Sequence, residues 1–196
     1  TKVYLKMSDA AAKLCDGLGL ERVMSTIEDT LKEGPVVVVT ENAYLTPLKI
    51  SDTLDAYING MNDLDVNRYM MAVRRQTQTP ESIATYIRSN AVDPAAILFG
   101  LFIGKILRGT VRLHGINYKT GKAHIGIALF DKAIWGQKWG TKAIISITRF
   151  AFATLGLTEI VAGIFKANIG SRKAFKSAGF DHIPSLDYYE NKKPIE

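Results

Sequence analysis

The sequence predicts an α+β fold, in which a mixed, mostly antiparallel sheet is flanked by helices. Between residues 97 and 130, three apolar stretches are separated by short glycine-containing turns, a pattern typical of antiparallel strands. Residues 141–155 have helical periodicity and lead into another apolar stretch, which indicates a strand–helix–strand crossover with parallel strands. The 196 residues suit one domain with a sizeable core.

Composition narrows the class of protein. Apolar residues make up 47% and charged residues 22%, as in ordinary globular proteins. No apolar run approaches the ~18 residues of a membrane span, and no signal-peptide pattern is visible. A lone Cys15 cannot form an internal disulfide, so we expect a cytoplasmic protein. The net charge of +6 suits an anionic ligand such as coenzyme A or a nucleotide.

The N-terminal segment differs from the rest of the chain, and we expect two parts, 1–34 and 35–196. Apolar residues at helical spacing predict an amphipathic helix over 21–33, which Gly34-Pro35 ends. The stretch 12–23 resembles the C-terminal end of a nucleotide-sugar hydrolase of pseudaminic acid synthesis. Two interpretations stay open: residues 1–34 are the remnant of an upstream domain, or they form an N-terminal helical extension.

Each element of the second part has a local signal. Residues 36–48 are expected to be one extended strand, with Pro47 at its exit. Ser51 and Asp52 can cap a helix that reaches Asn59, and Thr79-Pro80 begins a helix that reaches Ser89. Further strands are expected at 97–103, 106–116, 124–130 and 158–165.

Alternation along 124–130 divides that strand into two faces. Ile125, Ile127 and Leu129 share one face, and His124, Gly126, Ala128 and Phe130 share the other. After this strand comes a glycine-bearing turn, and after the turn the helix 141–155. A strand, a glycine turn and a helix start gather backbone N–H groups around one point, which favours an anion site.

Two blocks in this order resemble the GNAT acetyltransferases of the branch that acetylates ribosomal proteins (RimJ/RimL type). The first block is Trp135-Gly136-Gln137-Lys138-Trp139-Gly140-Thr141-Lys142-Ala143. The second runs from Asn168 to Gly179-Phe180, one helix and one strand later. The resemblance implies the GNAT fold and an enzyme that transfers acetyl from acetyl-CoA, without a metal, to a primary amine. The acceptor can be a small molecule, such as a nucleotide-linked amino sugar, or a protein N-terminus.

The resemblance also implies which residues hold acetyl-CoA. The loop 136–141 would bind the pyrophosphate, and the backbone at 128–130 would pair with the pantetheine arm. Asn168 matches the family's cofactor-contacting asparagine, although a helix N-cap is an alternative role. The expected cofactor-binding residues are Ala128, Leu129, Phe130, Trp135, Gly136, Gln137, Lys138, Trp139, Gly140, Thr141 and Asn168.

Departures from the family pattern bear on catalysis. At the position where the family usually has a glutamate, this chain has His124, and a histidine can accept a proton near neutral pH. At the position of the tyrosine often proposed as general acid, this chain has Phe175. Ser171 is then the candidate acid. His114 is a second candidate base, and a water relay without a single base is also open. A structural role for these side chains remains an alternative.

Two other functions compete with the enzyme. The chain could be a catalytically silent module that binds coenzyme A as a sensor, an alternative motivated by Phe175 and Lys138. It could also bind nucleic acid, but its basic residues are not clustered with aromatic ones, which weakens that interpretation. We expect no membrane partner, and the sequence leaves the oligomeric state open, with a homodimer among the options.

Overall fold

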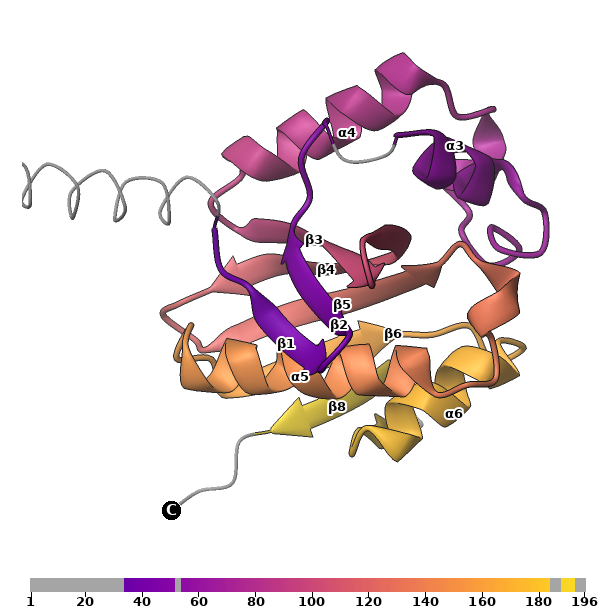
Figure 1. Cartoon of the computed structure of the whole chain (residues 1–196). Helices are drawn as coiled ribbons and strands as arrows, with labels where there is room; N and C mark the ends of the chain where they lie inside the picture. The colour runs from indigo at the N-terminus through magenta and orange to yellow at the C-terminus, as the bar shows by residue number, and fades with distance from the viewer. Residues whose placement is uncertain (1–33, 52–53, 184–187, 193–196) are drawn as a thin grey trace, which may run out of the picture. The chain divides into compact units, whose positions relative to one another are not determined.

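A computed structural model describes residues 34–51, 54–183 and 188–192 of the chain (Figure 1). The predicted helix over 21–33, and the interpretations of residues 1–33, fall outside the described residues. No helix in the described ranges has the length and apolar character that crossing a membrane requires.

In the part of the chain that the structure describes, eight strands form one mixed sheet in the order β1-β2-β3-β4-β5-β6-β8-β7. Neighbouring strands are antiparallel except β5 and β6, which are parallel and joined through α5. The predicted α+β class and the parallel crossover are therefore confirmed. The strands are β1 (Val37–Thr40), β2 (Ala43–Pro47), β3 (Ala96–Ile103), β4 (Ile106–Asn117), β5 (Lys122–Leu129), β6 (Glu159–Gly163), β7 (Asp181–Ile183) and β8 (Tyr188–Lys192).

Helices cover both faces of the sheet (Figure 1). They are α3 (Leu54–Asn62), α4 (Pro80–Val92), α5 (Trp139–Ala153) and α6 (Ile169–Ser177), with short 3-10 turns at Val73–Arg75 and Lys132–Ile134. Helix α4 begins at Thr79-Pro80 as predicted. Thr79 caps it, because its side chain accepts a hydrogen bond from the Ser82 N–H and the Ser82 hydroxyl accepts one from the Thr79 N–H. This capping box sets the start of the helix.

Three expectations need correction. The single strand expected at 36–48 is a hairpin of β1 and β2, since the chain turns at residues 41–42. This turn contains neither glycine nor proline, but Asn42 is a residue type that favours turns. Helix α5 begins at Trp139, two residues before the predicted start. Strands β7 and β8 were missed, because they are short.

Two apolar cores lie on opposite faces of the sheet. Ile125, with Ile127 and Leu129 packed alongside, belongs to the core beneath α5 and α6. Phe130, with Ala128 packed alongside, belongs to the core beneath α3 and α4. The predicted alternation of β5 is thus confirmed, and each face of the strand meets a different pair of helices.

Strands β5 and β6 separate partway along their length. Their pairing joins Lys122–Glu159, Ala123–Ile160 and His124–Val161, and it stops there. Beyond His124, β5 continues to pair with β4, up to Leu129 opposite Gly109. Residues 125–129 therefore have one backbone edge that faces the gap between the diverging strands.

Candidate active site

The free edge of β5 presents the backbone groups of alternate residues. The Phe130 N–H donates to the Arg108 carbonyl on the β4 side (2.9 Å). The backbone groups of Leu129 point away from β4, and the Leu129 carbonyl accepts a hydrogen bond from Trp135 Nε1 (3.1 Å). By this alternation the polar groups of Leu129 and Ile127 face the gap, whereas those of Ala128 and Phe130 face β4. Of the predicted set 128–130, Leu129 is placed to pair with a ligand, and Ile127 was missed.

The turn after β5 leads directly into the N-terminus of α5. Gly136 has φ of +75°, and Lys138, the N-cap of α5, has φ of +64°. A lysine in this left-handed conformation is uncommon and costs roughly 1 kcal/mol, a strain often found at functional sites. Because α5 begins at Trp139, the N–H groups of its first turn have no intrahelical acceptor, and the helix dipole adds positive potential. This end of α5 is suited to an anion.

Other loop residues that we expected to contact a cofactor already have partners in the protein. The Gln137 side chain donates to the Ala133 carbonyl (2.7 Å), and the Thr141 hydroxyl donates to the Ala174 carbonyl of α6 (3.4 Å). At Gly140, an added Cβ would lie 3.6 Å from Leu129 Cδ1, an ordinary contact. The positive-φ backbone that allows close approach therefore lies at Gly136 and Lys138, not at Gly140.

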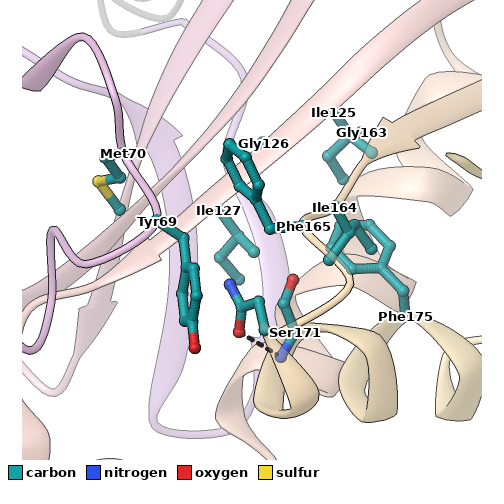
Figure 2. A pocket seen from close by; sticks show the side chains of 11 residues that line it. Tyr69, Met70, Ile125, Gly126, Ile127, Gly163, Ile164, Phe165, Ser171 and Phe175 are labelled. Carbon is teal, nitrogen blue, oxygen red and sulfur yellow. Dashed lines mark hydrogen bonds between the residues drawn. The ribbon is translucent and has the colours of Figure 1, made fainter. Parts of the chain in front are cut away.

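A cavity occupies the gap between β5 and β6 and reaches both faces of the sheet (Figure 2). Tyr69 and Met70 approach it from one side, and Ile164 and Phe175 from the other. Its lining residues are Tyr69, Met70, Ile125, Gly126, Ile127, Gly163, Ile164, Phe165, Asn168, Ser171 and Phe175. The structure thus brings Ser171 and Asn168 together here, close to the free edge of β5.

Asn168 is a helix N-cap, the alternative to its role as a cofactor contact. Its side-chain oxygen accepts a hydrogen bond from the Ser171 N–H (3.1 Å, dashed in Figure 2), so Asn168 caps α6. Phe175 is buried and packs edge-to-face on Phe180, with ring centroids 5.0 Å apart. Phe175 has no hydroxyl, so the polar side chains on this wall of the cavity are Asn168 and Ser171.

His124 lies where β5 and β6 begin to diverge, one pleat from Gly126 in the cavity lining. Its exposed imidazole stacks on His114 of β4, with ring centroids 5.4 Å apart. Partial burial lowers the pKa of His114 below its usual value, and the nearby Arg112 and His124 lower it further. The two candidate bases are therefore neighbours, which sequence alternation alone could not reveal because it does not give cross-strand register.

The segment 63–70 spans the mouth of the gap. On the β5 side, Lys132 Nζ contacts Asp63 (2.7 Å) and Asp65 (3.2 Å). On the β6 side, the Tyr69 hydroxyl donates to the Ala167 carbonyl (2.9 Å), and its ring stacks on Phe165 with centroids 6.2 Å apart. We name this segment the bridging loop. Tyr69 was not among the residues that the sequence predicted for the site.

The hollow above Gly126 is open. A Cβ built at Gly126 would meet no atom within 4 Å, whereas at Gly109 on β4 a Cβ would lie 2.5 Å from the Ala128 carbonyl oxygen. Within the described ranges, no three histidine, cysteine, aspartate or glutamate side chains gather to hold a metal ion. The polar groups in and beside the cavity are backbone groups, imidazoles, hydroxyls and one amide.

Known proteins share sequence and fold with this chain. Residues 42–181 match the family of the acetyltransferase (GNAT) domain. The uncharacterized N-acetyltransferase p20 of Bacillus licheniformis is 24% identical over 157 residues, which cover 79% of this chain and 87% of p20. Two other curated relatives are matched over only 33% and 52% of their own lengths.

Solved structures share the fold. RimL, a ribosomal L7/L12 α-N-protein acetyltransferase in complex with coenzyme A, superposes with a TM-score of 0.64 at 15% identity, covering 81% of this chain and 98% of RimL. The spermidine N-acetyltransferase of Vibrio cholerae, in complex with coenzyme A and spermine, gives a TM-score of 0.63 at 18% identity, covering 74% of this chain and 83% of that one. At these identities the likeness concerns the fold.

Proposed function

The chain belongs to the GNAT acetyltransferase family, and we propose that it transfers an acetyl group from acetyl-CoA to a primary amine. One observation carries the proposal: the free backbone edge of β5 opens into a cavity next to the uncapped N-terminus of α5. An extended amide-bearing arm can pair with that edge, and its phosphates can reach the helix start. The match to the acetyltransferase (GNAT) domain family, together with the fold shared with solved acetyltransferases, supports the same function.

The residues present fit coenzyme A. The N–H groups at 139–141 would hold the pyrophosphate, with Lys138 adding positive charge. The backbone of Leu129 and Ile127 would pair with the pantetheine arm, which requires Trp135 Nε1 to give up the Leu129 carbonyl. When bound, acetyl-CoA supplies the activated acetyl group as a thioester. Ile125, Ile127 and Phe175 would enclose the thioester in apolar surroundings.

His124 would act on the acceptor amine. Amines are mostly protonated at neutral pH, and only the neutral form attacks an acyl group. An imidazole at the divergence of the strands could remove this proton directly or through one water. Ser171 lines the opposite wall, where its hydroxyl could donate a proton to the departing thiolate. A water relay in place of His124 is the alternative.

Two acceptor classes remain under this proposal. A protein N-terminal amine is supported by the likeness to RimL, and a nucleotide-linked amino sugar by the resemblance at residues 12–23. The tested quantity is thiol released from acetyl-CoA, measured with a peptide series and with amino-sugar nucleotides, followed by mass analysis of the product. Thiol release with at least one amine is expected. Binding of acetyl-CoA without release for any amine would contradict the proposal and favour the silent coenzyme A-binding module.

A further inference from the structure

The lining of the cavity is uncharged, and charged side chains lie only around it. None of the lining residues is an aspartate, glutamate, lysine or arginine. An acceptor with a second ammonium group would need a carboxylate partner, because burying an unpaired charge is costly. Such a partner would have to lie on the acceptor side of the cavity, which is the side of α3 and α4 where His124 and the bridging loop lie.

The acidic residues of the bridging loop are already engaged. Lys132 lies 2.7 Å from Asp63 and 3.2 Å from Asp65, and Arg68 lies 3.7 Å from Asp65. The hydrogen bond from Lys132 holds the pKa of Asp63 below its ordinary value. Both carboxylates are thus matched by a lysine that belongs to the protein.

The open hollow above Gly126 has one cationic neighbour, Arg112, on the same face of the sheet. Arg112 is the direct cross-strand partner of Gly126. Its Nε donates to Asn90 Oδ1 (2.6 Å), and its guanidinium lies 5.7 Å from the centroid of the Tyr86 ring. These partners fix the guanidinium without neutralising it. The next cross-strand pair along β4 and β5 is the stacked pair His114–His124.

We propose that the acceptor side of this cavity selects monoamines, in which the rest of the molecule is neutral or anionic, and rejects polyamines. This inference rests on the proposed function and adds the substrate class. Fixed positive charge at Arg112, together with bridging-loop carboxylates occupied by Lys132, discriminates against a second ammonium. The same charge arrangement attracts an anionic group elsewhere on the acceptor.

Three acceptors of matched length test the selection: hexylamine, 1,6-diaminohexane and 6-aminohexanoate. They present the same primary amine and differ at the far end, which is apolar, cationic or anionic. We expect kcat/KM for hexylamine and 6-aminohexanoate to exceed that for the diamine by about tenfold, after division by two for its equivalent amines. A diamine that reacts equally well or better overturns the inference, and would point to the Tyr69 and Phe165 rings as a cation site.

Two matched variants test the role of Lys132. Lys132→Met releases Asp63 at the bridging loop and leaves Asp65 with Arg68 alone. Lys122→Met releases Glu159, which Lys122 contacts at 3.0 Å at the paired end of β5 and β6. The ratio of diamine to monoamine kcat/KM should rise several-fold in Lys132→Met and stay unchanged in Lys122→Met. An unchanged ratio in Lys132→Met contradicts the assignment. Because the readout is a ratio, a general loss of activity cancels.

Calorimetry on the same protein separates the two levels of the proposal. If acetyl-CoA binds but none of the three amines binds or reacts, the inference on monoamines fails, and the proposed function is then judged on peptides and amino sugars. If acetyl-CoA does not bind, the proposed function itself fails.

Discussion

The two sides of the cavity are built by different means. On the side of α5 and α6, the surfaces suited to a ligand are backbone: the free edge of β5 and the first turn of α5. On the side of α3 and α4, they are side chains of the bridging loop and of β4 and β5, such as Tyr69, Arg112 and His124. Backbone surfaces suit a ligand common to a family, while side chains can change from one protein to the next. Substitutions on either side of the cavity can therefore test this division.

The largest effect is expected at His124. His124→Ala should lower kcat by at least about tenfold, since positioned general bases contribute ~10²–10⁴-fold. The affinity for acetyl-CoA should stay nearly unchanged, because the edge of β5 and the start of α5 are untouched. Steady-state kinetics and calorimetry measure the two quantities.

The control for this substitution is His182→Ala in β7. His114→Ala does not serve, since His114 stacks directly on His124. Near-normal turnover of His124→Ala at saturating acceptor would make that residue structural and favour a water relay.

Gly126→Val should separate stability from activity. The hollow above Gly126 has room for the new side chain, and valine suits a strand, so the free energy of unfolding should change by no more than ~0.5 kcal/mol. The acceptor's kcat/KM should fall by about tenfold or more, because the side chain fills space on the acceptor side. Acetyl-CoA affinity should stay within about twofold.

Gly140→Ala is the matched glycine substitution on the cofactor side. Its Cβ makes ordinary contacts, so we expect little change in either affinity or turnover. If Gly126→Val instead weakens acetyl-CoA binding and leaves acceptor kinetics intact, the two sides of the cavity are assigned the wrong way round.

A smaller effect is expected at Lys138. Asparagine tolerates the left-handed conformation of this residue, so Lys138→Asn removes the charge and keeps the backbone. Acetyl-CoA affinity should fall by roughly two- to fivefold, as for an exposed charge pair, and the loss should shrink in high salt. An affinity that does not change would show that the backbone alone serves this end of the site.

The smallest effect concerns pH. Burial, with Arg112 and His124 nearby, lowers the pKa of His114 in the folded protein, so the unfolded chain binds its proton first as pH falls. Stability should therefore decline as pH drops below ~6.5, the ordinary value for histidine. His114→Phe retains a stacking ring and should reduce this decline, as measured by denaturant unfolding at pH 5 and pH 7. An equal decline in both proteins would assign the acid sensitivity to other groups.

The sequence predicted the backbone side of the site better than the side-chain side. The glycine turn and helix after β5 follow from local patterns, and they led to the right fold and family. The boundary error at α5 has a local cause, since Lys138 takes a conformation that lysine rarely adopts. By contrast, Tyr69 meets Ala167 across 98 residues of chain, and His114 meets His124 through strand register. Neither contact leaves a local signal.

Amide hydrogen exchange followed by NMR, with and without acetyl-CoA, tests the central claim most directly. If the cofactor is held by backbone on the α5 side, acetyl-CoA should slow exchange of the amides of Ile127 and Leu129 on β5 and of Gly140 and Thr141 on α5. Amides of the bridging loop should respond mainly when an acceptor analogue is added. Protection of the bridging loop by acetyl-CoA alone, with exchange at Leu129 and Gly140 unchanged, would contradict the account.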